Sequence, residues 1–115
     1  TGRSAEVIIS GGVNIYPQEI DNILIKHSAV ADAACVGVPN ADWGEEVKAV
    51  IQLKSGTIAS AELTEQLIEF TAKHLAKQKI PRSIDFISEL PRSQAGKVQR
   101  KKLRDSYWPT QQTII

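Results

Sequence analysis

Two runs of apolar residues on either side of a turn place the strongest constraint on the fold of this chain. Residues 30–38 are rich in alanine and valine, which is typical of a buried strand. Residues 47–53 alternate between apolar and polar side chains, which predicts a strand with one face on the core. Residues 39–42 have the sequence Pro-Asn-Ala-Asp, which is typical of a turn and is expected to end the first strand. The middle of the chain is therefore predicted to contribute two strands.

A glycine pair and a proline organise the N-terminal part of the chain. Apolar runs at residues 7–9 and 13–15 flank Gly11 and Gly12, which predicts a hairpin or a sharp glycine bend. Pro17 is well suited to the first turn of a helix, and apolar residues then recur at helical spacing. The residues expected on the inward face are Ile20, Ile23, Leu24 and His27.

Later signals complete the predicted architecture. Ser60 is expected to cap a second helix that Pro81 ends, and residues 83–87 are expected to form a third core strand. A polar loop at residues 91–96 leads to a short helix at residues 101–108. The second helix is predicted to bury Leu63, Leu67, Phe70 and His74. The fold class is α+β: a small two-layer domain with an N-terminal hairpin and a three-stranded sheet, packed with two main helices and a short C-terminal helix.

Charge and cysteine content exclude several classes of function. The formal net charge is +1, from 14 basic and 13 acidic residues, which argues against a nucleic-acid binder. Cys35 is the only cysteine, so no internal disulfide can form and a reducing compartment such as the cytoplasm is expected. No stretch has the length and apolar character of a transmembrane segment. His27 and His74 have no accompanying Cys/His cluster, so no metal site is predicted.

Three features could carry chemistry, although each has a simpler explanation. Lys97 follows a glycine on a loop, where a lysine could bring a positive charge to a phosphate or carboxylate, but a solvated lysine is the commoner case. Gly11 and Gly12 could admit a ligand close to the backbone, although a plain hairpin turn explains them as well. Trp43 could equally form the wall of a ligand site or anchor its loop. The chain also contains a basic cluster, which consists of Arg100, Lys101, Lys102 and Arg104. This cluster is interpreted as a solvated helix face.

Several short segments follow one another in an order that resembles a known family. They are Gly2–Ile20, which contains the glycine pair and Tyr16-Pro17, then Val36–Pro39, Trp43–Glu45, Lys48-Ala49, Lys79–Arg82 and Leu90–Val98. Together they resemble the C-terminal domain of an acyl-CoA synthetase of the fatty-acid-CoA ligase type, in the adenylate-forming, AMP-binding superfamily. Each motif is moderately specific, whereas the ordered set is highly specific. The resemblance covers nearly the whole chain.

This resemblance implies a domain, residues 1–115, of an acid–thiol ligase whose substrates are ATP, with Mg²⁺, and CoA. A large N-terminal domain would hold ATP and a carboxylic acid, expected to be a fatty acid. Residues 1–6 would form the hinge and residues 109–115 a tail. The small domain would act in two orientations and is expected to be inactive by itself.

The resemblance also assigns roles to single residues. In the first orientation Lys97 would reach the carboxylate and the α-phosphate as acyl-AMP forms, and Arg3 would contact the ribose. Reversible acetylation of Lys97 by a lysine acetyltransferase would remove its charge. In the second orientation a tunnel for the pantetheine arm of CoA would be lined by Gly11 and Gly12, with Trp43 as a wall. Lys79 and Arg82 are weaker candidates for binding the CoA phosphates.

The chain departs from the family pattern at the hinge, where Ala5 stands in place of the usual Asp or Lys. Ala5 is expected to alter the balance between the two orientations. Alternatively, Glu6 would partly substitute for the missing polar side chain. Val13 also occupies a position that is commonly acidic. Two alternatives remain open: an adenylation domain that loads a carrier protein, and a non-catalytic interaction module that has kept the fold.

Overall fold

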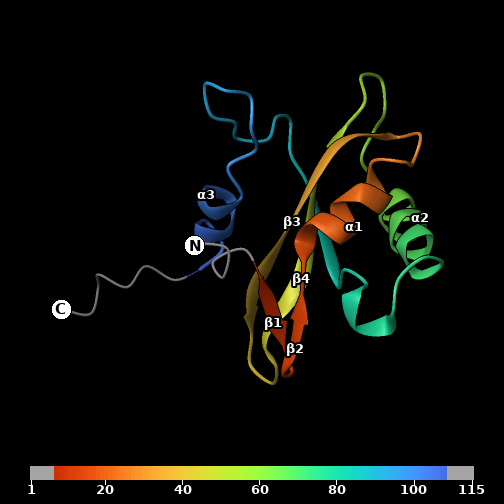
Figure 1. Ribbon diagram of the computed structural model, residues 1–115. Helices are drawn as coiled ribbons and strands as arrows, with labels where there is room; N and C mark the ends of the chain where they lie inside the picture. The colour runs from red at the N-terminus through yellow and green to blue at the C-terminus, as the bar shows by residue number, and fades with distance from the viewer. Residues whose placement is uncertain (1–6, 109–115) are drawn as a thin grey trace.

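The computed structural model describes residues 7–108 and contains two small sheets and three α-helices (Figure 1). The elements are β1 (Ile8–Ser10), β2 (Val13–Ile15), α1 (Pro17–Leu24), β3 (Val30–Asn40), β4 (Gly44–Leu53), α2 (Ala61–Ala72), the 3₁₀ helix η2 (Lys77–Lys79), β5 (Ser83–Phe86) and α3 (Arg100–Asp105). The predicted α+β class, N-terminal hairpin, three-stranded sheet and three helices are confirmed. Arg3 and Ala5, with the rest of the expected hinge and the tail, lie outside the described residues.

The larger sheet has the order β3-β4-β5, with β4 in the centre. β3 and β4 are antiparallel and remain paired up to Asn40 opposite Gly44, whereas β5 runs parallel to β4. The prediction that Pro39 ends the first strand is wrong, because β3 continues through it. β3 is an edge strand, and proline is tolerated there because its missing N–H need not face a neighbouring strand. β5 is likewise an edge strand and is only partly buried, rather than a core strand.

Both faces of the larger sheet are covered. Val47, Ala49 and Ile51 of β4 pack in a core with the N-terminal hairpin, α1 and α2. Val50 faces the other way, into a second cluster that includes Leu90 and Leu103. Figure 1 shows α1 and α2 on one side of the β3–β4 pair and α3 on the other. The strand at residues 47–53 is therefore not half-buried as predicted, because the C-terminal segment shields its second face.

Local signals set the starts of the two longer helices. Pro17 occupies the first turn of α1, and Glu19 follows it in the same turn, where an acidic side chain favours the helix dipole. The Ser60 Oγ accepts a hydrogen bond from the Leu63 N–H at 3.0 Å and caps α2, as predicted. Both helices end earlier than expected. Within residues 7–108, every helix is too short or too polar to cross a membrane.

The buried face of α2 differs from the predicted one. Leu63 and Leu67 are buried as predicted, together with Thr71, whereas Phe70 is only partly buried and His74 is exposed beyond the end of the helix at Ala72. Pro81 therefore does not end α2, because the chain passes through η2 before it reaches this proline. The connection through η2 brings the residues around Lys77 next to the N-terminal hairpin, where they help to form a cavity.

Candidate functional site

The turn between β1 and β2 requires its two glycines. Gly11 and Gly12 have φ angles of +58° and +85°, the left-handed conformation that two-residue hairpin loops demand. The Gly11 N–H donates to the Trp43 carbonyl at 3.0 Å, so the hairpin is attached to the β3–β4 turn. A Cβ added at Gly12 would meet no atom of residues 7–108 within 4 Å. The outer side of this turn is therefore open to a ligand or to another domain.

Trp43 is fixed at its backbone and partly exposed at its ring. The Asn40 Oδ1 accepts hydrogen bonds from the N–H groups of Asp42 and Trp43, each at 2.8 Å, which closes the turn between β3 and β4. Trp43 is 40% exposed, and the guanidinium of Arg82 lies 4.1 Å from its ring centroid. This distance indicates a cation–π contact, which holds a positive charge against a flat apolar surface.

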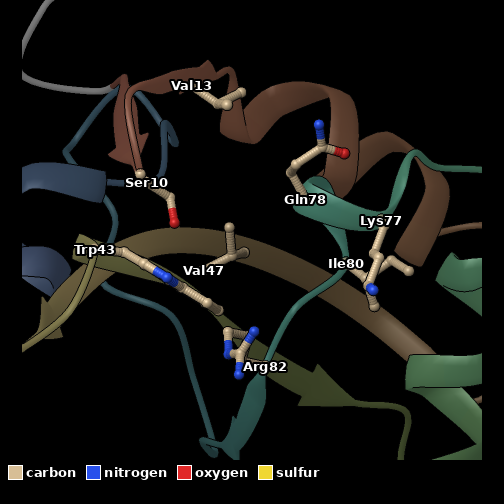
Figure 2. A pocket seen from close by; sticks show the side chains of 9 residues that line it. Ser10, Val13, Trp43, Val47, Lys77, Gln78, Ile80 and Arg82 are labelled. Carbon is tan, nitrogen blue, oxygen red and sulfur yellow. The ribbon is translucent and has the colours of Figure 1, made fainter.

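A cavity of about 290 Å³ joins these groups (Figure 2). The hairpin, the β3–β4 turn, β4 and the chain from η2 to β5 form its walls. Its lining residues are Ser10, Gly11, Val13, Trp43, Val47, Lys77, Gln78, Ile80 and Arg82. The structure thus brings together Gly11, Trp43 and Arg82, three of the five residues to which the family resemblance assigned CoA binding. A mostly apolar lining that also contains Lys77 and Arg82 fits a ligand that carries both apolar and phosphate groups.

Lys79 does not line this cavity. Its Nζ lies 2.9 Å and 3.2 Å from the two carboxylate oxygens of Glu19 in α1, and Glu19 is not among the lining residues either. Lys77, Gln78 and Ile80 line the cavity instead. Sequence reasoning missed Lys77, and no local signal distinguishes it from Lys79, which lies two residues further on.

The loop that carries Lys97 is ordered by its own hydrogen bonds. The Ser93 N–H donates to the Lys97 carbonyl at 2.8 Å, and the Gly96 N–H donates to the Ser93 carbonyl at 2.9 Å. Gly96 has a φ of +86°, which explains the glycine before the lysine. Lys97 itself is exposed. In Figure 1 the loop of residues 91–97 lies at the opposite end of the molecule from the β1–β2 turn. The structure therefore does not bring Lys97 and the glycine pair together.

The basic cluster is only partly solvated. The Arg100 Nη1 lies 2.9 Å from the Asp21 Oδ2 and donates to the Cys35 carbonyl at 2.9 Å. The Arg104 Nη2 donates to the Glu45 Oε2 at 3.2 Å. The predicted solvated face is therefore wrong for these two arginines, whereas Lys101 and Lys102 are exposed.

Asp21 is the buried centre of this network. Its Oδ1 accepts a hydrogen bond from the Cys35 N–H at 2.7 Å. Burial raises the pKa of the Asp21 carboxyl, and the positive charge of Arg100 opposes this rise. Burial, and then the charge of Asp21, raise the pKa of the Cys35 thiol well above its ordinary value, so this cysteine is a poor nucleophile. The network is thus a structural anchor between α1, β3 and α3.

The histidines contribute to an aromatic contact. His27 and His74 meet the ring of Phe70 edge-on, with centroids 5.1 Å and 5.4 Å away. Among residues 7–108, no three side chains of the His, Cys, Asp or Glu type gather as they would around a metal ion.

Comparisons with known proteins agree with this combination of fold and motifs. Residues 19–97 match the family described as AMP-binding enzyme C-terminal domain. The chain is 41% identical over 101 residues to the long-chain-fatty-acid–CoA ligase of Bacillus subtilis, and the match covers 88% of this chain and 18% of that protein. It is 41% identical over 102 residues to the 2-succinylbenzoate–CoA ligase of Bacillus cereus, covering 89% of this chain and 20% of that protein.

A solved structure gives the same result. The crystal structure of an acyl-CoA synthetase from Brucella canis superposes with a TM-score of 0.86 at 42% identity, covering 92% of this chain and 20% of that one. The chain spans about a fifth of the length of these relatives. The family match covers more than half of the chain, and the chain therefore belongs to the family of C-terminal domains of AMP-binding enzymes.

Proposed function

We propose that this chain is the mobile C-terminal domain of an ATP-dependent, AMP-forming acyl-CoA synthetase and that it serves two half-reactions in turn. The observation that carries the proposal is that the Lys97 loop and the glycine turn lie at opposite ends of one domain (Figure 1). Two groups so placed cannot face one reaction centre together. Rotation of the domain against a large N-terminal domain would present each of them in turn.

In the first half-reaction, a carboxylate oxygen of the acid attacks the α-phosphate of ATP. The new bond gives acyl-AMP, and pyrophosphate leaves. Two anionic groups must approach each other, and the ammonium group of Lys97 offsets their repulsion as charge builds up in the transition state. We propose Arg3 as the ribose contact and Ala5 as the pivot. The large domain would bind ATP and its Mg²⁺, and the acid would be a fatty acid, in line with the name of the Bacillus subtilis relative.

In the second half-reaction, the thiol of CoA attacks the acyl carbon of acyl-AMP. The thioester forms and AMP leaves. The pantetheine arm would pass Gly11 and Gly12, where a side chain would obstruct it, and Trp43 would form the wall beside it. Arg82 and Lys77, which both line the cavity, would hold the phosphates. Lys79 would join them only after leaving Glu19.

Trp43→Ala tests the assignment of this cavity. In the chain joined to its N-terminal domain, we expect the KM for CoA to rise roughly tenfold, because the variant removes both the wall and the surface that holds Arg82. ATP–pyrophosphate exchange should remain unchanged, because it does not involve CoA. Ile58→Ala is the matched control, since Ile58 is 82% exposed and does not line the cavity. An unchanged KM for CoA in Trp43→Ala would mean that this cavity does not bind CoA.

Lys97 is also a site that a modifying enzyme could reach. Its side chain is exposed on a loop, as a lysine acetyltransferase requires of its target. Acetylation would remove the positive charge that the first half-reaction uses. We propose that modification at Lys97 stops acyl-AMP formation and spares the thioester step.

A further inference from the structure

Arg92 connects the lysine loop to the larger sheet. Its Nη1 donates to the Gly96 carbonyl at 2.9 Å, and its Nη2 forms an ion pair with the Asp32 Oδ2 on β3. Asp32 is oriented for this contact, because its Oδ1 accepts a hydrogen bond from the Ala33 N–H at 2.9 Å. One guanidinium group therefore joins a fixed strand to the tip of the loop.

The contact point is next to the lysine along the backbone. The Gly96 carbonyl belongs to the peptide bond that contains the Lys97 nitrogen, so Arg92 holds the peptide plane from which Lys97 extends. Ser93 holds the backbone on both sides of the Lys97 Cα, with its Oγ 3.3 Å from the Lys97 N and its N–H 2.8 Å from the Lys97 carbonyl. The direction in which Lys97 leaves the loop is therefore set by Arg92 and Ser93, and Asp32 ties Arg92 to the sheet.

We propose that Arg92, held by Asp32, is a positioning residue that aims Lys97 at the reacting groups during acyl-AMP formation. This inference rests on the proposed function of Lys97. The side chains of Arg92 and Asp32 are 38% and 25% exposed, and partly exposed ion pairs of this kind contribute little to folding. Misplacing a catalytic group by about 1 Å, in contrast, can slow a reaction about a hundredfold. The pair should therefore affect the rate much more than it affects stability.

A double-mutant cycle in the chain joined to its N-terminal domain tests this role. We expect Arg92→Ala to lower kcat for ATP–pyrophosphate exchange roughly tenfold, with KM values for ATP and acid close to the wild-type values. Asp32→Ala should give a similar loss, and the double variant should be no slower than either single one, because both act through one contact. Thioester formation from pre-made acyl-AMP should be unaffected. Arg92→Lys should restore little of the lost exchange rate, because the ammonium group of lysine lacks the two forked NH₂ groups with which a guanidinium reaches two acceptors.

Lys101→Ala is the control, because it removes one positive charge from an exposed pair with Asp105 on α3 that includes no residue of the loop. Unchanged exchange in Arg92→Ala, alongside a loss in Lys97→Ala, would overturn the positioning role and leave the proposed function intact. Additive losses in the cycle would also overturn it, since Arg92 would then act without Asp32. An equal loss in both half-reactions, with a lower unfolding temperature, would assign the pair a structural role instead. Normal exchange in Lys97→Ala as well would reject the proposed function itself.

Discussion

Replacing Lys97 by alanine is expected to slow acid-dependent ATP–pyrophosphate exchange by about a hundred- to a thousandfold in the chain joined to its N-terminal domain. The acid and the α-phosphate are both negatively charged, and the variant removes the cation that would offset their repulsion. Electrostatic groups that act on a developing charge have effects of this size because they act most strongly in the transition state. The measurement is incorporation of labelled pyrophosphate into ATP at saturating acid.

The side chain of Lys97 is exposed, so its loss should leave the folded domain intact. Thermal unfolding of Lys97→Ala is therefore expected to match that of the wild type, and Lys101→Ala should exchange pyrophosphate at the wild-type rate. A Lys97→Ala protein with normal exchange would mean that this residue is only a surface lysine. The catalytic assignment would then be wrong.

Replacing Arg100 by methionine is expected to lower the free energy of unfolding of this chain by about 3–5 kcal/mol. The side chains of Arg100 and Asp21 are only 12% and 6% exposed, so the variant leaves a buried carboxylate without its cation. The Cys35 carbonyl also loses a hydrogen-bond donor at 2.9 Å. A loss of this size is a large share of the roughly 5–15 kcal/mol that stabilises an ordinary domain. Urea denaturation followed by circular dichroism measures it.

Two further variants test whether the loss in the free energy of unfolding comes from the unpaired buried carboxylate. Lys101→Met removes an exposed (i, i+4) pair on the same helix and should cost no more than about 0.5 kcal/mol. The double variant Asp21→Asn with Arg100→Met should recover part of the loss, because it removes the unpaired buried charge. Equal stability of Arg100→Met and Lys101→Met would show that the buried pair does not anchor the C-terminal segment.

Signals within a few residues predicted much of this fold. Gly11 and Gly12 specify the hairpin because both take positive φ angles, and Ser60 specifies the start of α2 through its cap. The strand pattern of residues 47–53 gave the position of β4. These elements were predictable because the residues that determine them are close together in the sequence.

Contacts between distant segments were not predictable in the same way. Arg100 belongs to a run of basic residues that is typical of a solvated helix face, and only the fold brings it to Asp21 in α1. The second face of β4 is buried because the segment after β5 returns across it, which no periodicity in residues 47–53 indicates. Lys77 and Lys79 are two residues apart, and only the folded structure shows that Lys77 lines the cavity while Lys79 pairs with Glu19.

The candidate site was predicted in part. Gly11, Trp43 and Arg82 come from three separate segments, and the structure places all three around one cavity. Their common location supports the grouping, whereas their binding of CoA stays a prediction. The roles of Arg92 and Asp32 could not be predicted, because the contact between them depends on how the lysine loop folds against β3.

Opposite ends of this one domain are proposed to serve different half-reactions. The most direct test of this division is single-turnover thioester formation from pre-made acyl-AMP and CoA, in the chain joined to its N-terminal domain. The variants are Lys97→Ala, Gly12→Val and the matched control Gly56→Val. Gly56 has a φ of +89° against +85° at Gly12, and an added Cβ at either would meet no atom of residues 7–108 within 4 Å. Both valine variants should therefore carry a similar backbone strain of about 1–2 kcal/mol.

We expect Lys97→Ala to form thioester at the wild-type rate and Gly56→Val to do the same. Gly12→Val should be slower by about tenfold or more, which corresponds to a barrier raised by about 1.4 kcal/mol or more. It should still exchange pyrophosphate normally. Loss of thioester formation in Lys97→Ala, or equal rates in Gly12→Val and Gly56→Val, would contradict the division of the two half-reactions between the two ends of the domain.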